Sequence, residues 1–183
     1  MLNMIFILLP RAQVSAKRIC EVLETENRIN DGKGTEVEPD MQGYVEFRNV
    51  SFRYPGAGDD TLSDISFTAR KGETVAFIGA TGSGKTTLIN LIPRFYDASK
   101  GQVLVDGVDV RDYRQKDLRN RIGYVSQKAT LFRGTVFSNV AYGENGRPAT
   151  GTQEVKEAVS IAQAADFVER MPEKYEGVIA QGG

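Results

Sequence analysis

The hydrophobic pattern of the chain begins with an almost wholly apolar segment at residues 1–9. A membrane-spanning helix needs about 20 such residues, so this segment is too short to cross a bilayer alone. Basic residues follow at Arg11, Lys17 and Arg18, as they do on the cytoplasmic side of a membrane helix. Other residues recur every three or four positions on one helical face: Ala12, Ala16, Ile19, Val22 and Leu23. We interpret this region as the last turns of a membrane span that continue as a helix to about Thr25; the alternative is the start of a buried helix.

Three segments carry the hydrophobic patterns of β-strands. Residues 44–54 alternate between apolar and polar side chains with a break in phase near Asn49, which predicts an antiparallel or edge strand. Residues 74–78 form a short continuous apolar run, which predicts a fully buried strand. Residues 122–126 predict another strand.

A hairpin and several helices complete the pattern. Residues 103–105 and 108–110 are apolar-rich and flank Asp106 and Gly107, two residues that tolerate a tight turn. Helical periodicity marks three further segments: residues 85–95, 114–121 and 152–171. Because strands and helices alternate along the chain, the predicted class is α/β.

The charge balance and the rare residue types narrow the possible chemistry. With 23 basic and 24 acidic residues, the net charge is −1, so no broad cationic field favours nucleic acid. Cys20 is the only cysteine and histidine is absent, which excludes an internal disulfide and a Cys/His zinc site and fits a reducing, cytosolic setting. Without histidine, catalysis needs carboxylates, lysine, a metal ion or backbone dipoles.

A glycine-rich motif lies between the run at residues 74–78 and the helix predicted at residues 85–95. It matches the pattern G-x-x-x-x-G-K-[ST]. Its glycines let the backbone curl so that N–H groups converge on phosphate oxygens, and the following helix adds its positive N-terminal end. The motif therefore predicts a nucleoside triphosphate site at Gly79, Ala80, Thr81, Gly82, Ser83, Gly84, Lys85 and Thr86.

The polar side chains of this motif have distinct predicted roles. Lys85 extends to the β- and γ-phosphates, and the hydroxyl of Thr86 is a ligand for the Mg²⁺ that accompanies them. Thr87 is a further candidate to reach a phosphate oxygen.

Residues around this loop resemble the nucleotide-binding domain of ATP-binding cassette (ABC) transporters, specifically exporters whose membrane and motor domains share one polypeptide. Residues 9–12 and 15–19 look like the end of the last membrane helix of such exporters. Residues 50–55 match the segment whose aromatic residue, here Tyr54, stacks on adenine in the family. The flat face of a tyrosine ring suits such a contact physically.

Two later segments extend the resemblance. Residues 124–127 resemble the Q-loop, whose glutamine, here Gln127, helps to hold Mg²⁺ and senses the γ-phosphate in the family. Residues 131–136 and 139–140 are similar to the exporter region where coupling helices of the membrane domain dock. Thr135 is at the same time a candidate helix N-cap.

The resemblance implies an organisation in three parts. Residues 1–29 are the cytoplasmic end of the last transmembrane helix, and residues 30–43 are a linker, since residues 30–40 combine two glycines, a proline and mixed charge. Residues 44–183 are a partial ABC nucleotide-binding domain. The predicted fold is a P-loop NTPase core with an antiparallel β subdomain and the start of a helical subdomain, truncated.

Three parts that the family uses for hydrolysis have no match in this sequence: a hydrophobic strand ending in Asp-Glu, a Ser-Gly-Gly signature loop and a switch histidine. Residues 180–183 resemble the stretch just ahead of the signature loop, so we expect a fragment cut at both ends. No catalytic residue is predicted within it, and we expect it to bind ATP and Mg²⁺ without turning ATP over alone. In the full-length parent, the resemblance implies ATP-driven transport at the cytoplasmic side of the cell membrane. The implied partners are a second nucleotide-binding domain and the coupling helices.

Two other classes remain open. A small-molecule kinase or GTPase can use the same loop, although the Asn-Lys-x-Asp segment that a GTPase needs is missing. A nucleotide-free interaction module is the second alternative, against which the intact Gly84, Lys85 and Thr86 argue.

Overall fold

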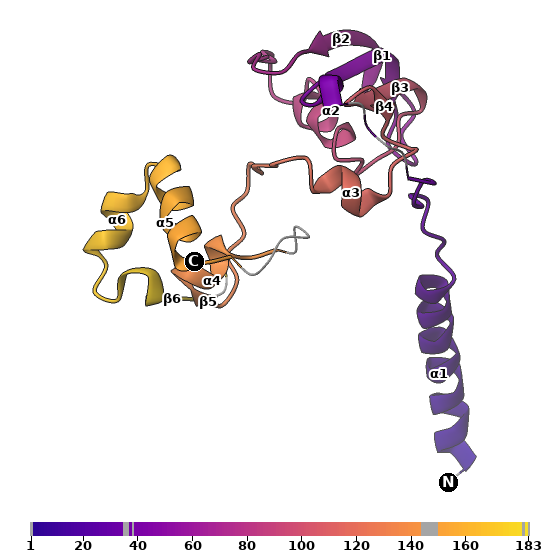
Figure 1. The fold of residues 1–183 in the computed structure, drawn as a ribbon. Coiled ribbons are helices and arrows are strands. Elements are labelled where there is room, and N and C mark those ends of the chain that lie inside the picture. The colour runs from indigo at the N-terminus through magenta and orange to yellow at the C-terminus, as the bar shows by residue number, and fades with distance from the viewer. Residues whose placement is uncertain (1, 35–36, 38, 144–149, 181, 183) are drawn as a thin grey trace. The chain divides into compact units, whose positions relative to one another are not determined.

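The structure is a computed structural model that describes residues 2–34, 37, 39–143, 150–180 and 182 (Figure 1). Parts of the predicted membrane-helix end, linker and C-terminal stretch lie outside the described residues: Met1, Thr35, Glu36, Glu38, Gln181 and Gly183. The chain divides into two compact units, Met1–Leu118 and Arg119–Gly183.

The N-terminal helix α1 spans Leu2–Leu23 and contains Pro10. It ends close to the predicted position, and the hydroxyl of Thr25 donates a hydrogen bond to the carbonyl of Glu21 at 2.7 Å just beyond its last turn. Several apolar side chains of this helix are exposed: Leu9, Val14, Ile19, Val22 and Leu23. Across the described part of the chain, no helix combines the length and apolar character that a membrane crossing requires.

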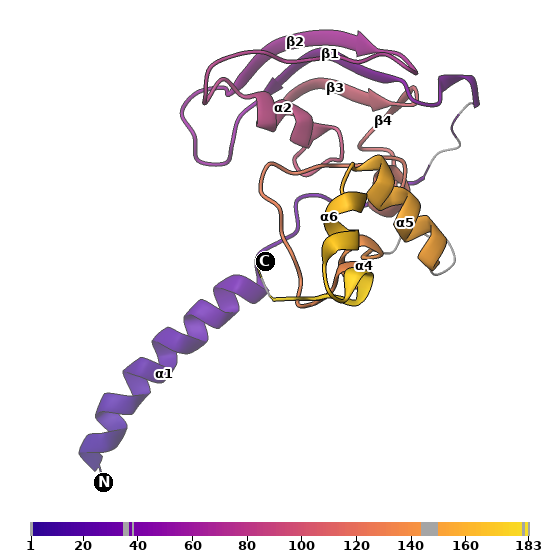
Figure 2. The same ribbon diagram turned by 90° about the vertical axis from the view of Figure 1, so that its left-hand side faces the viewer.

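A four-stranded antiparallel sheet forms the centre of the first unit, with the strand order β2-β1-β3-β4 (Figure 2). Its strands are β1 (Val45–Phe52), β2 (Leu62–Ala69), β3 (Lys100–Val105) and β4 (Val108–Asp109). The antiparallel prediction for β1 is confirmed. The edge alternative is wrong, because β1 pairs with β2 on one side and β3 on the other. β2 is not among the strands that the hydrophobic pattern predicts.

The phase break predicted near Asn49 is a bulge in β1. The register with β2 shifts between Phe47 and Val50, and Asn49 has a positive φ of 46°. Its backbone N–H donates to the hydroxyl of Ser66 at 2.9 Å instead of continuing the ladder. The extra residue turns both Phe47 and Val50 into the core, although they are three positions apart.

The hairpin predicted at Asp106 and Gly107 joins β3 to β4. Both residues have positive φ, 51° and 81°, and Val105 pairs directly with Val108 across this two-residue turn. Asp106 is buried and its carboxylate accepts a hydrogen bond from the N–H of Gly43 at 2.7 Å. The turn therefore also fixes the chain that enters β1.

Helix α2 (Lys85–Leu91) lies beside the sheet and packs Leu88 and Leu91 into the core (Figure 2). The run at residues 74–78, which precedes the loop before α2, is not a strand, so this prediction is wrong. Phe77 packs against Phe67 of β2 at a centroid distance of 5.0 Å, while Ile78 is 97% exposed. Within the run only Phe77 is partly buried, and no strand within the described residues pairs with it.

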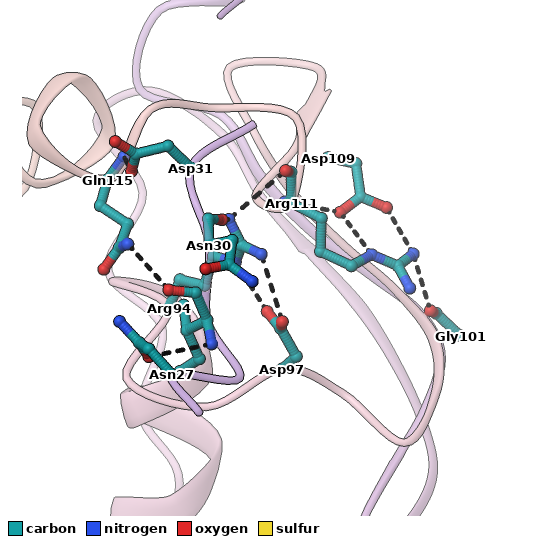
Figure 3. A network of polar contacts seen from close by, with 10 residues as sticks. Asn27, Asn30, Asp31, Arg94, Asp97, Gly101, Asp109, Arg111 and Gln115 are labelled. Carbon is teal, nitrogen blue, oxygen red and sulfur yellow. Dashed lines mark hydrogen bonds and ion pairs between the residues drawn. The ribbon is translucent and has the colours of Figure 1, made fainter. Parts of the chain in front are cut away.

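Within the first unit, a polar network holds the segment between α1 and the sheet (Figure 3). The buried Arg94 forms an ion pair with Asp97 at 2.7 Å and donates to the carbonyl of Asn30 at 2.9 Å. The N–H of Gln115 donates to the carboxylate of Asp31 at 2.9 Å. Asn30 and Asp31 of the predicted linker are therefore attached to the segments that follow α2 and β4.

Two backbone contacts strengthen this attachment. The N–H of Gly32 donates to the carbonyl of Tyr113 at 2.9 Å, and the N–H of Gly34 donates to the carbonyl of Asp112 at 3.0 Å. A Cβ atom at Gly32 would collide with the backbone of Asp112. Glycine is required there because the two backbones pass so close together.

The second unit is mainly helical. Its elements are α4 (Val136–Val140), α5 (Thr152–Ile161), α6 (Ala165–Arg170), the 3-10 helix η2 (Lys174–Glu176), and the strands β5 (Gly134–Thr135) and β6 (Val178–Ile179). The short helix α3 (Gln115–Arg119) lies at the boundary with the first unit. Valine side chains form the core: Val136, Val155, Val159 and Val168.

Two predictions for the second unit need correction. The single helix predicted at residues 152–171 is two helices, separated at Gln163, which has a positive φ of 57°. The strand predicted at residues 122–126 is an extended segment outside any sheet, and Val125 is 96% exposed. Among the described residues, no strand joins this segment in a sheet, as for residues 74–78.

Candidate nucleotide-binding site

The glycine-rich loop at residues 79–85 forms a tight curl ahead of α2. Gly82 and Gly84 have positive φ of 84° and 87°, and the N–H of Ser83 donates to the carbonyl of Ala80 at 3.2 Å. A Cβ atom at Gly84 would lie 2.8 Å from the Leu62 side chain, because the loop passes close to the start of β2. The backbone conformation and this close approach both require glycine.

The Lys85 side chain folds back across the loop. Its ammonium group donates to the carbonyls of Gly79 and Ala80, both at 2.8 Å, and lies 3.3 Å from the hydroxyl of Ser83. These contacts hold the curl closed and keep a positive charge within it. An anion that approached the loop would meet this charge together with the loop N–H groups.

The two threonines after Lys85 lie in different surroundings. Thr86 is exposed, so its hydroxyl is accessible to a ligand. Thr87 is buried, and its hydroxyl forms a hydrogen bond with the hydroxyl of Tyr54 at 2.9 Å. The predicted base-binding and phosphate-binding segments are therefore in direct contact.

Tyr54 follows β1 and belongs to a small aromatic cluster. Its ring meets Phe52 edge-on at a centroid distance of 4.8 Å and Tyr96 at 5.2 Å. The sequence does not predict the place of Tyr96 in this cluster, because hydrophobic periodicity does not show which aromatic residue after a helix turns toward a distant strand. The cluster fixes Tyr54 beside α2 while its side chain remains partly exposed.

Gln127 lies in the second unit, on the exposed extended segment that ends the run at residues 122–126. The hydroxyl of the adjacent Ser126 donates to the carbonyl of Lys128 at 2.8 Å, which shapes a local turn. Thr86 and Gln127 belong to separate units, so their joint Mg²⁺ site remains a prediction. Hydroxyl and amide oxygens are hard ligands that suit Mg²⁺ when phosphates and water complete its coordination.

The segment at residues 131–140 presents an ordered aromatic surface. Asn139 binds both backbone groups of Phe132, accepting from its N–H at 2.8 Å and donating to its carbonyl at 3.0 Å. Phe132 stacks on Tyr142 with a centroid distance of 4.4 Å, and the two residues are 45% and 67% exposed. The predicted N-cap is confirmed, since the hydroxyl of Thr135 accepts from the N–H of Ser138 at 3.0 Å.

The first unit is a mixed α/β unit in which a curled loop with a lysine opens a helix beside an antiparallel sheet, which agrees with part of an ABC ATPase domain. The family model described as "ABC transporter" matches residues 62–182, and the chain belongs to this family. The match assigns the loop to ABC transporters rather than to a kinase or GTPase.

Individual relatives carry ABC transporter, flippase or ABC exporter descriptions. The chain is 41% identical over 175 residues to the ATP-dependent lipid A-core flippase of Aromatoleum aromaticum, covering 94% of this chain and 28% of that protein. It is 44% identical over 184 residues to an uncharacterized ABC transporter ATP-binding protein of Mycobacterium tuberculosis (strain H37Rv). This alignment covers 100% of this chain and 31% of that protein. The structure of a bacterial Atm1-family ABC exporter with ATP bound matches with a TM-score of 0.80 and 31% identity, covering 99% of this chain and 31% of that one. The chain therefore spans less than a third of these relatives.

Proposed function

We propose that this chain binds ATP with Mg²⁺ as part of the motor domain of an ABC exporter. The main observation in support is the position of the Lys85 ammonium group. It lies inside the loop and donates hydrogen bonds to the carbonyls of Gly79 and Ala80, both at 2.8 Å. In the proposed complex, Lys85 and the loop N–H groups bind the phosphates, and Thr86 and Gln127 are ligands of Mg²⁺. Tyr54 stacks on the base.

In the longer protein, we infer that ATP binding and hydrolysis drive transport across the cell membrane, with this portion on the cytoplasmic side. A second nucleotide-binding domain completes the ATP site. The exposed rings of Phe132 and Tyr142 belong to the surface that coupling helices of the membrane domain contact. The support is the family membership and the similarity to an ATP-bound exporter.

We further propose that residues 1–183 do not turn ATP over alone. Phosphoryl transfer requires a positioned water, a metal ion and stabilising charge around the γ-phosphate. The loop supplies phosphate and metal contacts, but no residue of the sequence is assigned to position the attacking water. Steady phosphate release by the purified chain, abolished in Lys85→Ala, would contradict this proposal.

Calorimetric titration of the folded chain with Mg-ATP tests the proposed function. Wild type is expected to release or absorb heat with a saturable isotherm and to gain thermal stability. Lys85→Ala is expected to weaken binding at least about tenfold, since it removes a charge-assisted contact to phosphate. The matched control is Lys71→Ala, at an exposed lysine in the turn after β2, which should bind as wild type. Folded wild-type chain without binding would instead favour a nucleotide-free interaction module.

A further inference from the structure

Residues 29–34, which we call the strap, are bonded more densely than their linker-like composition suggests. The carbonyl of Ile29 accepts a hydrogen bond from the side-chain amide of Gln115 at 3.1 Å. The carbonyl of Asn30 accepts from the guanidinium of Arg94, just after α2, at 2.9 Å (Figure 3). A glycine-containing linker behaves as a flexible coil when nothing binds it. These contacts instead give the strap a fixed path along the first unit.

The strap also reaches the start of α3. The N–H of Gln115 donates to the carboxylate of Asp31 at 2.9 Å. Gln115 is the first residue of α3, and the first N–H groups of a helix have no partner inside the helix. A carboxylate 84 positions earlier in the chain therefore supplies the partner that stabilises this helix end.

The two glycines of the strap bring its backbone against the segment before α3. The N–H groups of Gly32 and Gly34 donate to the carbonyls of Tyr113 and Asp112 at 2.9 and 3.0 Å. A Cβ atom at Gly32 would collide with the backbone of Asp112. All the bonds of the strap to this segment need the same close approach, so we expect them to form and break together.

We propose that the strap is a conformational coupling element between α1 and α3. When it is attached, it holds the start of α3 in place, and when it is released, α3 loses the partner of its first N–H. Because α3 lies at the boundary between the two units, the strap connects the chain that follows α1 to this boundary. In the longer protein, a displacement of α1 reaches α3 through ordered chain, separately from the surface at residues 131–140. This last consequence rests on the proposed function, whereas the attachment itself requires no nucleotide.

Hydrogen exchange of single amides, measured on the whole chain without nucleotide, tests the coupling. The reporter in α3 is the amide of Leu118, which donates to the carbonyl of Arg114 at 3.1 Å and has no bond to the strap. In wild type, the amides of Gly32 and Gly34 are expected to be protected. Gly32→Ala is expected to speed exchange at Leu118 about 3- to 10-fold, the range for loss of a partner at a helix start, and to leave the β1 amides within about twofold of wild type.

The matched control for this variant is Gly58→Ala. No heavy atom lies within 4 Å of a Cβ added at Gly58, so all amides are expected to exchange as in wild type. A second variant, Asp31→Ala, changes an exposed side chain and carries the same test should Gly32→Ala fail to fold. It is expected to speed exchange at Leu118 and also at the two strap glycines, whose bonds it does not touch. Its own control is Asp59→Ala, at an exposed carboxylate in the same unit.

Three results would overturn the coupling. Unprotected amides at Gly32 and Gly34 in wild type would show that the strap is not attached. Faster exchange of the strap with an unchanged Leu118 would show that the strap does not hold α3. Exchange of the β1 amides that rises as much as that of Leu118 would make the strap an ordinary part of the core. A chain that passes these tests but fails to bind Mg-ATP in the separate titration would contradict only the proposed function.

Discussion

The four-stranded sheet and the two runs at residues 74–78 and 122–126 have similar apolar character but differ in burial. In the sheet, Phe47 is 1% exposed. In the two runs, Ile78 and Val125 are 97% and 96% exposed. Apolar content therefore does not decide whether a segment is buried in this chain.

The difference lies in the neighbours that each segment has. β1 has hydrogen-bonded strands on both edges, and the short turn at Asp106 and Gly107 brings β3 and β4 together locally. A strand is fully buried only when it pairs with other strands on both edges and when other elements pack on both of its faces. In the run at residues 74–78, only Phe77 is partly buried, where it contacts Phe67.

The largest predicted effect compares one apolar side chain from each region. Phe47→Ala is expected to lower the free energy of unfolding of the sheet by about 3–5 kcal/mol, because it leaves a cavity in the core beside Phe67. Ile78→Ala is expected to change this free energy by less than about 0.5 kcal/mol. Hydrogen exchange of the β1 amides measures both changes. Equal losses would show that the run at residues 74–78 is as buried as the sheet.

An intermediate effect compares a glycine from each region. Gly107→Ala is expected to destabilise the sheet by about 1–2 kcal/mol, because Gly107 has a φ of 81° that an L-residue adopts at a cost. Its Cβ would also lie 3.1 Å from the Met41 side chain. Gly123→Ala is the control, since no heavy atom lies within 4 Å of its added Cβ and a neutral result is expected. Urea unfolding, monitored by circular dichroism, measures the stability of both variants. A destabilised Gly123→Ala variant would mean that the segment around Gly123 is packed.

The smallest effect concerns a polar contact at the end of the sheet. Burial raises the pKa of the Asp109 carboxyl, but hydrogen bonds from Arg111, one of them 2.7 Å long, outweigh this and leave the pKa below its ordinary value. Because the folded pKa is lowered, ionised Asp109 stabilises the fold above about pH 4 and this contribution is lost as the pH falls through the folded pKa. Arg111 is partly exposed, so the contribution is expected to be at most about 1 kcal/mol.

Asp109→Asn tests this contact by urea unfolding at a series of pH values from 7 to about 3. The variant is expected to lose part of the stability at neutral pH and to show a flatter decline on acidification. The control is Asp59→Asn, at an exposed carboxylate in the same unit, which should keep the wild-type slope. An unchanged slope in Asp109→Asn would show that the ion pair does not contribute.

The features that the sequence predicted correctly are local. The break near Asn49, the turn at Asp106 and Gly107, and the cap at Thr135 each depend on residues close in the chain. The missed strand β2 and the split of the helix predicted at residues 152–171 depend on packing between distant segments. Propensity and periodicity carry no direct information on such packing, because tertiary contacts override them.

The sequence by itself determined the family and predicted the phosphate loop, because glycines, a lysine and a hydroxyl at fixed spacing form a recognisable motif. Only the tertiary structure decided which hydroxyl faces Tyr54, since the two threonines after Lys85 are identical in type and differ only in direction around α2. It also decided which apolar runs are covered, because burial depends on neighbours that lie far away in the chain.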